Sequence, residues 1–335
     1  MKKLNFAIIG TGSMANIYAQ ILKNSISADI AAVCGNTKNK TKLFAKNFSC
    51  KYYSNANIDA MIREHNEIDA VIITTPEWVR ETIIRKLLKR KIHILCEKPM
   101  AASLSEGKRI YNLLKNYPKY FMVAHSLRFN PNFFVIKEKL KQKKIGDLKL
   151  ILSRRNANKE LVKRVRGKFE LSFWLSPHEI DVITWFSNSK IKKVFAKGPQ
   201  SKKNSDFISC LFTLEDGTHA HHLVNWSNDP ISSTSNQSSF EIYGSKGVIA
   251  INDNPNHIIL YKDNNYVEGL DTNYSAKYKE NNYGYFNNLI SYFINIIINN
   301  KKPIFTIKDS LDVLTVCDAI SRSINTSKEI EIKYL

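Results

Sequence analysis

The feature that most constrains the fold is a glycine turn between a short apolar run and an amphipathic segment. Residues 4–9 form a short run that is apolar except for Asn5, which is typical of a strand buried on both faces of a parallel sheet. Gly10 and Gly12 follow at once, and residues 13–22 then carry apolar side chains at helical spacing. We predict a strand, a tight turn and a helix, in that order.

The same alternation of apolar runs and helical segments repeats over the first third of the chain. Further strands are predicted at residues 30–34, 70–74, 93–96 and 121–124, and further helices at 40–47, 79–88 and 103–114. Strands that alternate with helices of this length need crossover connections, which make the strands parallel. We therefore predict an N-terminal Rossmann domain, a doubly wound parallel sheet, over residues 1–124.

Beyond residue 124 the pattern changes to short apolar runs separated by turn residues. Strands are predicted at 148–153, 194–197, 207–213, 220–226, 239–243, 247–252 and 258–261. Helices are predicted at 177–186, 285–298 and 307–324. This pattern predicts a second α/β domain with a mostly antiparallel, open sheet over residues 125–335, so the fold class is α/β throughout.

The glycine turn has the spacing G-x-G-x-x-A, from Gly10 to Ala15. Gly10 permits a tight turn, the missing side chain at Gly12 lets the backbone approach a pyrophosphate, and Ala15 is small enough for close packing of helix on strand. Ser13 and Met14 open the helix, whose N-terminus stabilises an anion. Because the motif follows a strand and begins a helix, we interpret it as a dinucleotide-binding turn; a glycine turn that binds nothing is the alternative.

The turn after the second predicted strand has no acidic residue. A carboxylate there would bond the adenosine ribose hydroxyls and repel a 2′-phosphate. The chain instead has Asn36 and Thr37, which can donate hydrogen bonds, and Lys38 and Lys40, which supply positive charge. These residues favour NADP over NAD as the cofactor; a merely polar turn that accepts either one is the alternative.

Composition narrows the classes of partner. Lys and Arg number 50 against 30 Asp and Glu, a net charge of +20, but the basic residues are spread along the chain without an aromatic-interleaved motif. A solvated surface is therefore favoured over nucleic-acid binding. The five cysteines are odd in number and far apart, which fits a reducing cytoplasm. No signal peptide or membrane span is predicted, so we expect a soluble, cytoplasmic protein without membrane contact.

Five short motifs stand in order along the chain: the glycine motif at 10–15, Thr74-Thr75-Pro76, Glu97-Lys98-Pro99, Arg128-Phe129-Asn130-Pro131 and His178-Glu179-Ile180-Asp181. In this order and spacing they resemble the Gfo/Idh/MocA oxidoreductases, from the first strand to the last helix. The resemblance implies hydride exchange between a nicotinamide and a carbinol carbon of a sugar, cyclitol or nucleotide sugar. It also implies a homodimer or homotetramer packed through the open sheet.

Lys98 lies just beyond the predicted strand 93–96. Ligands of open α/β sheets bind at the carboxyl ends of the strands, and an ammonium there can polarise a carbonyl or hydrogen-bond a substrate hydroxyl. The resemblance implies that Lys98 is catalytic. We count Glu97, Lys98, Thr74 and Pro76 among the cofactor-binding residues; a Glu-Lys-Pro turn that simply ends a strand is the alternative.

His178 and Asp181 lie three residues apart at the start of a predicted helix, so both project to one side of it. A histidine can take or return a proton near neutral pH, and an aspartate can hold a substrate hydroxyl. The resemblance implies a catalytic histidine at His178 and a substrate-contacting aspartate at Asp181. A structural histidine is the alternative reading of the residues alone.

The sequence departs from the family pattern at three places. Trp174 stands where many dehydrogenating members have an aspartate, four residues before His178. Residues 169–173 replace a glycine-rich run, and Arg80 occupies a position where the family often has a histidine. An indole offers apolar surface and one N–H donor but no base, so Trp174 is expected to shape the substrate pocket while His178 exchanges its proton with water or substrate.

Other polar residues of the second half give weaker signals. Arg154 and Arg155 end the first predicted strand of the second domain, and Arg164 and Arg166 follow; one of them could bind a substrate phosphate or carboxylate, since guanidinium groups suit planar anions, and a solvated strand end is equally compatible. We count Arg154, and Arg128 of the Arg-Phe-Asn-Pro motif, as candidate substrate-binding residues. Three histidines at 219–222 share one predicted strand, but a metal needs further ligands and we expect no metal.

These observations predict an NAD(P)-dependent oxidoreductase that transfers a hydride between nicotinamide and a hydroxyl or ketone carbon of a sugar or nucleotide sugar. In this hypothesis Lys98 polarises the reacting oxygen, His178 relays the proton and Asp181 orients the substrate. The alternative, motivated by Trp174, is a non-catalytic dinucleotide- or sugar-binding sensor or accessory protein on the same fold.

Overall fold

The chain forms two compact units in the computed structural model, which describes residues 3–162, 170–199, 206–228, 237–253, 256–262, 265–271, 274, 276–278 and 281–335. One unit comprises Met1–Phe129 and Asn273–Leu311, and the other comprises Asn130–Thr272 and Asp312–Leu335. The domains expected from the sequence, 1–124 and 125–335, differ from these units mainly because residues 273–311 group with the N-terminal part of the chain.

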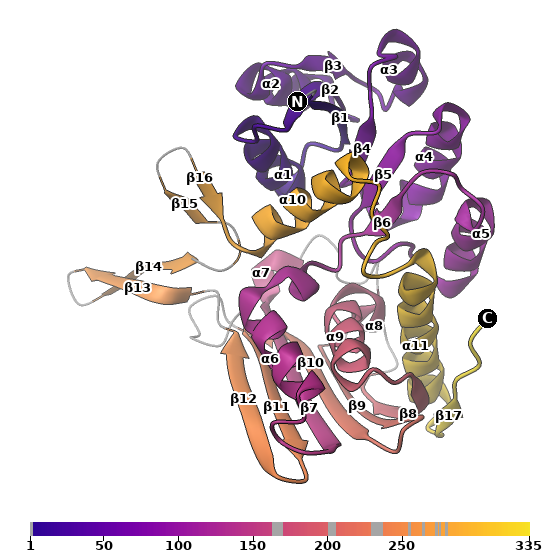
Figure 1. The fold of residues 1–335 in the computed structure, drawn as a ribbon, viewed down its shortest axis with the longest axis vertical. Helices are drawn as coiled ribbons and strands as arrows, with labels where there is room; N and C mark the ends of the chain where they lie inside the picture. Colours follow the sequence, from indigo (N-terminus) through magenta and orange to yellow (C-terminus); the bar gives the residue numbers. More distant parts are fainter. Residues whose placement is uncertain are drawn as a thin grey trace. The chain divides into compact units, whose positions relative to one another are not determined.

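The first unit is built on a six-stranded sheet with the order β3-β2-β1-β4-β5-β6, in which every pair is parallel (Figure 1). Its strands are β1 (Leu4–Ile9), β2 (Ala28–Cys34), β3 (Lys51–Tyr53), β4 (Ala70–Ile73), β5 (His93–Cys96) and β6 (Phe121–Val123). All four residues of the central strand β4 are buried. This explains why the strand reads as an unbroken apolar run rather than an alternating one.

The helices of the first unit form two groups. α1 (Ser13–Lys23) packs on α2 (Lys38–Phe48), whereas α4 (Arg80–Leu87) packs on both α3 (Ile58–Glu64) and α5 (Leu104–Leu114). Right-handed crossovers put the two groups on opposite faces of the sheet. The shorter elements are η1 (Glu77–Val79), η2 (Leu88–Arg90), η3 (Ser126–Phe129), β15 (Ala276–Tyr278) and β16 (Asn281–Tyr283).

A helix from the C-terminal part of the chain completes the first unit. α10 (Tyr285–Ile298), drawn in orange in Figure 1, lies against α1. The ring of Phe286 meets Tyr18 edge-on with centroids 5.7 Å apart, and Phe293 approaches Phe6 of β1 at 6.4 Å. Because α10 carries no charged residue and buries much of its apolar side chain surface here, residues 273–311 belong to this unit.

The second unit is built on a seven-stranded sheet with the order β12-β11-β7-β10-β9-β8-β17, in which only β7 and β10 pair in parallel. Its strands are β7 (Leu148–Asn158), β8 (Ile191–Lys197), β9 (Phe207–Leu214), β10 (His219–Asn228), β11 (Ser238–Gly244), β12 (Gly247–Asp253) and β17 (Ile330–Glu331); β13 (Asn256–Lys262) and β14 (Asn265–Asp271) form a separate hairpin. Its helices are α6 (Pro131–Lys141), α7 (Lys159–Val162), α8 (Leu171–Trp174) and α9 (Pro177–Ser187), and α11 (Ile307–Thr326) starts in the first unit and continues into this one.

The two faces of the second sheet differ. Along β9 buried residues alternate with more exposed ones, so one face carries the core and the other is open. Phe133 of α6, Phe186 of α9 and Phe240 of β11 form an aromatic cluster in this core, with centroids 5.4–6.0 Å apart. Phe207 and Leu211 are about half exposed on the other face, at 49% and 56%. Assembly of subunits through this open face stays a prediction.

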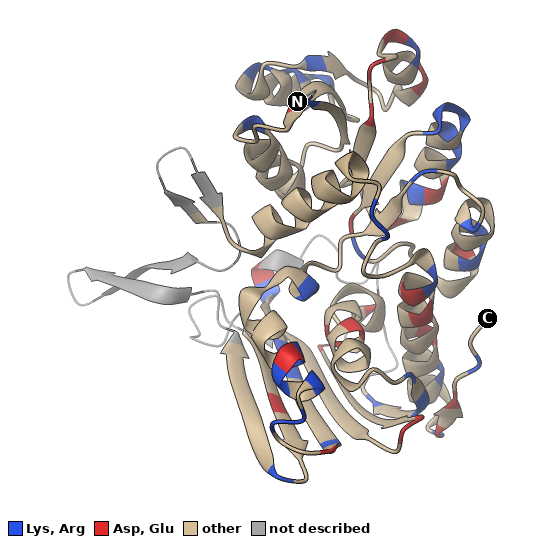
Figure 2. Ribbon diagram, in the orientation of Figure 1, with Lys and Arg blue, Asp and Glu red and all other residues tan. Residues whose placement is uncertain are grey.

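The predicted fold class is confirmed, a parallel Rossmann sheet followed by a mostly antiparallel one. The sequence analysis did not predict several short elements or α6; the missed helices are α3, α6, α7 and α8, and the missed strands are β3, β14, β15, β16 and β17. No helix within the described residues is long and apolar enough to span a bilayer. In Figure 2 Lys and Arg are interspersed with Asp and Glu over the coloured helices and loops, so within the described residues the positive charge is not gathered on one element.

Candidate functional site

The carboxyl ends of four neighbouring strands lie in one row. The last residues of β1, β4, β5 and β6 are direct partners in the sheet: Ile9, Ile73, Cys96 and Val123. The row continues one residue further, because Thr74 N–H donates to the Ile9 carbonyl at 2.8 Å and Glu97 N–H donates to the Ile73 carbonyl at 2.9 Å. The glycine turn, the Thr-Thr-Pro segment and the Glu-Lys-Pro segment therefore start side by side.

The glycine turn has the local geometry that a dinucleotide needs. Gly10 adopts φ +118°, and a Cβ there would lie 2.2 Å from Thr74 Oγ1, so only glycine fits between the two strands. Gly12 is exposed and a Cβ would meet nothing within 4 Å, which leaves its backbone open to a ligand. Ala15, in the first turn of α1, is fully buried.

Two further features of this row suit an anionic dinucleotide. The first turn of α1 contains no acidic residue, so no carboxylate of the helix itself offsets the partial positive charge at its N-terminus. The Thr75 hydroxyl oxygen is buried and has no hydrogen-bond partner within the described residues, as expected of a group that a ligand satisfies. Met14 is half-buried and its sulfur accepts a hydrogen bond from Tyr274 Oη at 3.4 Å. The residues present therefore fit a bound dinucleotide.

The turn after β2 is open to solvent. Asn36, Thr37 and Lys38 are all exposed, and α2 has no acidic residue in its first turn. The Asn36 carbonyl accepts a hydrogen bond from the backbone of Asn55, which fixes the turn against the loop after β3. Positive charge and free N–H groups at this helix start are compatible with a phosphate.

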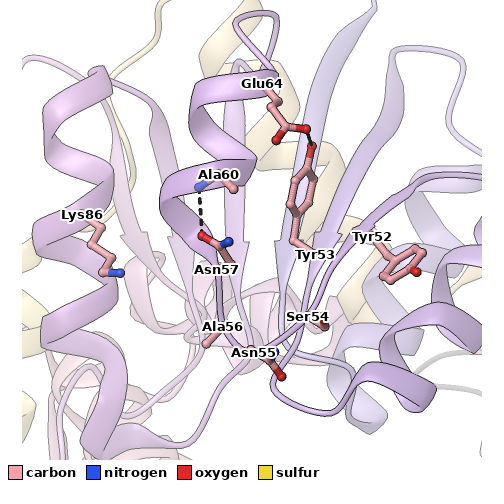
Figure 3. Close-up of a pocket in the computed structure, with 9 residues that line it drawn as sticks. All are labelled: Tyr52, Tyr53, Ser54, Asn55, Ala56, Asn57, Ala60, Glu64 and Lys86. Carbon is pink, nitrogen blue, oxygen red and sulfur yellow. Dashed lines mark hydrogen bonds between the residues drawn. The ribbon is translucent and has the colours of Figure 1, made fainter.

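A pocket of about 560 Å³ opens beside that loop (Figure 3). Its lining residues are Tyr52, Tyr53, Ser54, Asn55, Ala56, Asn57, Ala60, Glu64 and Lys86. Two of its walls are held by hydrogen bonds, from the Tyr53 hydroxyl to Glu64 at 2.8 Å and from the Ala60 amide to the Asn57 side chain at 3.1 Å. None of the predicted site residues lines this pocket, so the chemistry predicted from the sequence lies elsewhere.

Lys98 is half-buried, and its backbone amide donates to Glu97 Oε2 at 3.1 Å. The other carboxyl oxygen of Glu97 accepts a hydrogen bond from the Tyr18 hydroxyl of α1. Burial raises the pKa of Glu97 above its usual range, while Tyr18 and the ammonium of Lys98 pull that pKa down. The segment that carries Lys98 is thus tied to the helix of the glycine turn through a buried carboxyl group, a contact that sequence reasoning missed.

In the second unit, α9 begins at Pro177 after Ser176 and carries both His178 and Asp181 in its first two turns. His178 is half-buried and Asp181 is 1% exposed. The sequence predicted this helix and the shared placement of the two side chains on it. It did not predict what fixes the start of the helix.

A buried polar network holds the first turn of α9 to the sheet. His222 of β10 is fully buried and contacts Ser153 Oγ at 3.0 Å through Nδ1 and Ser176 Oγ at 3.2 Å through Nε2. Burial, aided by the positive charge of Arg155, lowers the pKa of His222 to about 3, so the ring is neutral at physiological pH. One ring nitrogen accepts and the other donates, which suits two hydroxyl partners.

An ion pair beside this network fixes the same turn. Arg155 Nε of β7 donates to Glu179 Oε1 at 2.5 Å, and the Ser238 hydroxyl of β11 donates to the same oxygen at 3.3 Å. Burial raises the pKa of Glu179 despite the opposing effect of Arg155. The residue directly after His178 is thus held to β7 and β11.

Comparison with known proteins decides the family. Residues 4–125 match the model of the oxidoreductase family with an NAD-binding Rossmann fold, GFO_IDH_MocA, and residues 133–250 match the GFO/IDH/MocA C-terminal domain. The chain belongs to the Gfo/Idh/MocA family of oxidoreductases. The predicted enzyme class, a dehydrogenase acting on CH–OH groups, is confirmed with it.

Members of the family with inositol activity are similar over the whole chain. Inositol 2-dehydrogenase of Rhizobium meliloti (strain 1021) is 22% identical over 339 residues, covering 98% of this chain and 99% of that protein. The structure of myo-inositol 2-dehydrogenase from Lactobacillus plantarum has a TM-score of 0.85 at 20% identity and covers 99% of this chain and 100% of that one. Scyllo-inositol dehydrogenase from Lactobacillus casei, with bound NAD(H) and scyllo-inositol, has a TM-score of 0.83 at 22% identity, with 98% and 99% coverage.

The other predicted site residues of this Gfo/Idh/MocA protein are more scattered. Trp174 is half-buried, with its ring 5.8 Å from that of the fully buried Trp226. Arg128 is 7% exposed and its guanidinium lies 5.0 Å from the Phe305 ring centre. Arg154 is exposed and bonds Gln237 at 3.3 Å, on the face of the sheet opposite Arg155, so the structure does not bring Arg154 together with α9.

The three histidines of β10 do not share one environment. His222 faces the core, whereas His221 lies on the other face, where its Nε2 contacts Ser209 Oγ at 2.9 Å, and His219 is exposed. Within the described part of the chain, no three His, Cys, Asp or Glu side chains gather as metal ligands. Arg164, Arg166 and residue 169 lie outside the described residues.

We predict that His222 makes the second unit acid-sensitive. Its folded pKa of about 3 lies below the ordinary 6.5, so the unfolded chain binds the extra proton between these values and stability falls as pH falls. From pH 7 to pH 5 the loss attributable to His222 is about 2 kcal/mol. Urea unfolding at both pH values, followed by tryptophan fluorescence, measures it, since Trp174, Trp185 and Trp226 all lie in this unit.

His222→Gln should remove most of this pH dependence, because glutamine offers one donor and one acceptor without titrating. His219→Gln, on the exposed end of the same strand, is the matched control and should behave as wild type. Equal losses of stability in wild type and His222→Gln between pH 7 and pH 5 would contradict the assignment.

Proposed function

We propose that the protein is an NAD(P)-dependent dehydrogenase of a cyclitol, sugar or nucleotide sugar, with Lys98 as the acid that polarises the reacting oxygen. The observation that carries the proposal is the in-register row at the end of the first sheet. In this row the glycine turn begins at the end of β1 and the Lys98 segment begins at the end of β5, and only β4 lies between these two strands. Ligands of open α/β sheets bind at this edge.

The residues proposed to hold the dinucleotide come from four turns of the first unit, those after β1, β2, β4 and β5. They are Gly10, Gly12, Ser13, Met14 and Ala15 of the glycine turn, Asn36, Thr37 and Lys38 after β2, and Thr74, Pro76, Glu97 and Lys98 on the row. A bound nicotinamide supplies the hydride acceptor or donor. The chain's own part is to bind and orient it, and the backbone N–H groups at the start of α1 would take the negative charge.

In this proposal the Lys98 ammonium donates a hydrogen bond to the substrate oxygen. When a hydroxyl is oxidised, that oxygen loses its proton as the carbon gives up its hydride; in the reverse direction it gains one. A cation beside the oxygen stabilises the negative charge that develops there. His178 would exchange this proton with substrate or water, and Asp181 would hold a second hydroxyl.

The inositol dehydrogenases among the relatives support a polyhydroxylated ring as the substrate. Trp174 in place of the carboxylate that many members carry favours a substrate with an apolar or stacking group near the reacting carbon. The competing candidate, a sensor or accessory protein that binds without turnover, is favoured by that same tryptophan. Lys98 and His178, both retained, favour the enzyme.

We predict that NADPH binds more tightly than NADH. Asn36, Thr37 and Lys38 provide donors and a positive charge but no carboxylate to repel a 2′-phosphate. Fluorescence titration of both cofactors measures the ratio. Asn36→Asp should lower the NADPH-to-NADH preference by about tenfold or more, equivalent to about 1.4 kcal/mol. Asn39→Asp, at an exposed position in the first turn of α2, serves as a control for added charge. Equal affinities in wild type, or tighter NADH, would reject the NADP assignment.

We predict that Lys98→Met lowers turnover by about 10²- to 10⁴-fold without unfolding the protein, because one well-placed acid contributes that much. The assay follows the reduction of dinucleotide with a panel of cyclitols, sugars and nucleotide sugars. Dinucleotide affinity and the melting temperature check that the first unit is intact. Lys108→Met, an exposed lysine of α5, is the matched control.

Two results would contradict the proposal. Near-normal turnover in Lys98→Met would show that another group is the acid. Tight binding of dinucleotide and of a panel member by the wild type, with no reduction or oxidation in either direction, would favour the accessory protein instead.

A further inference from the structure

Arg80 is a buried cation at the start of α4. Arg80 is 2% exposed, and an arginine is rarely buried to this extent unless its guanidinium group has partners. The sequence shows only that it replaces a histidine common in the family. Its contacts lie entirely within the first unit, and each one joins α4 to a segment of the row described above.

The guanidinium donates to the backbone of two neighbouring loops. Nε and Nη2 donate to the Thr75 carbonyl at 3.0 and 2.8 Å. Nη1 donates to the carbonyls of Glu97 and Pro99. Nη2 also lies 3.8 Å from the Glu77 carboxylate, which balances the charge.

Two of these acceptors flank Lys98 on either side. Arg80 therefore holds the backbone of the residue before and the residue after the proposed acid, while its other nitrogens hold the Thr-Thr-Pro loop. The Glu97 side chain adds a second attachment, through Tyr18, to the helix of the glycine turn. The Lys98 backbone is thus fixed both to α4 and to α1.

No other side chain can make this set of contacts. The guanidinium has five N–H donors in a rigid planar fork, whereas a neutral histidine has one N–H donor and a lysine ammonium is a compact group on a flexible stem. The contacts are specific to arginine rather than to positive charge.

We propose that Arg80 is a positioning residue that fixes where the Lys98 ammonium lies relative to the dinucleotide site. It does so by binding the carbonyls on both sides of Lys98 and the carbonyl of the Thr-Thr-Pro loop with one guanidinium group, an arrangement called the clamp below. This inference rests on the proposed function of Lys98. A displacement of about 1 Å of a catalytic group can cost about 10²-fold in rate, so loss of the clamp is expected to lower kcat by 10- to 100-fold. The KM for the polyol should change less than kcat.

The test compares Arg80→Ala and Arg80→Lys with Arg85→Ala, an exposed arginine on the same helix whose side chain is 51% exposed. Steady-state kcat and KM, dinucleotide affinity and melting temperature are measured for each. Both Arg80 variants should lose kcat, and Arg85→Ala should not. Millimolar guanidinium chloride should restore kcat of Arg80→Ala severalfold, because the ion can occupy the vacated site, whereas sodium chloride at the same concentration should not.

A double-mutant cycle separates positioning from general support of the fold. If Arg80 acts through Lys98, then adding Arg80→Lys to Lys98→Met should lower turnover much less than Arg80→Lys does in the wild type. An equal loss in both backgrounds would overturn the proposal, as would wild-type kcat in a folded Arg80→Ala or Arg80→Lys. Arg80→Lys retains the charge and is the informative variant if Arg80→Ala fails to fold.

The outcomes also distinguish this inference from the proposed function. Near-normal turnover in Lys98→Met rejects the role of Lys98 and with it the basis of the clamp. Loss of turnover in Lys98→Met together with full kcat in both Arg80 variants rejects only the role of Arg80.

Discussion

The register of the parallel sheet in the first unit is the constraint on which the rest of the site depends. Because Ile9, Ile73 and Cys96 are direct partners, the backbone leaves β1, β4 and β5 along one line. A shift of one residue in any of these strands would turn its side chains to the opposite face. The glycine turn and Lys98 are far apart in sequence, and this register brings them to the same edge of the sheet, with the end of β4 between them.

Backbone groups at such an edge need partners, and the first unit supplies them with buried polar side chains. Arg80 donates hydrogen bonds to the carbonyls of Thr75, Glu97 and Pro99, and the Tyr18 hydroxyl donates to the Glu97 carboxyl group. A buried charge is costly unless it is paired and hydrogen-bonded. The second unit uses the same solution at the start of α9, where His222 and the Arg155–Glu179 pair fix the helix. In each unit a half-buried side chain proposed to be catalytic lies beside backbone that buried polar side chains hold in place.

The sequence analysis predicted correctly those features that depend on hydrophobic periodicity and on the residues of a single turn. The apolar run 4–9, the two glycines and the helix at 177–186 each follow from rules that act within about ten residues of chain. The apolar segment 285–298 was also predicted as a helix. Its membership of the first unit was not, because the contact of Phe286 with Tyr18 joins residues far apart in the chain. Periodicity holds no information on such a pairing.

The same limit explains the residues that were missed or less well placed. Three histidines at 219–222 look alike in the sequence, and only the register of β10 sends His222 to the core and His221 to the open face. Arg154 and Arg155 were separated in the same way. Arg80 could be recognised as a departure from the family pattern. Its hydrogen-bond acceptors could not, because they are backbone carbonyls, and a sequence does not show which carbonyls will face a given side chain.

The most direct test of hydride transfer traces the hydrogen of the carbinol carbon into the dinucleotide, instead of measuring a reaction rate. The protein is incubated with oxidised dinucleotide and with cyclitols and sugars deuterated on their carbinol carbons, and the dinucleotide is then analysed by mass spectrometry. The account predicts that a substrate of this class transfers its deuterium to the nicotinamide ring, and that no solvent hydrogen is incorporated in its place. Reduced dinucleotide that carries only solvent hydrogen, or dinucleotide that stays oxidised with every polyol of the panel, would contradict it.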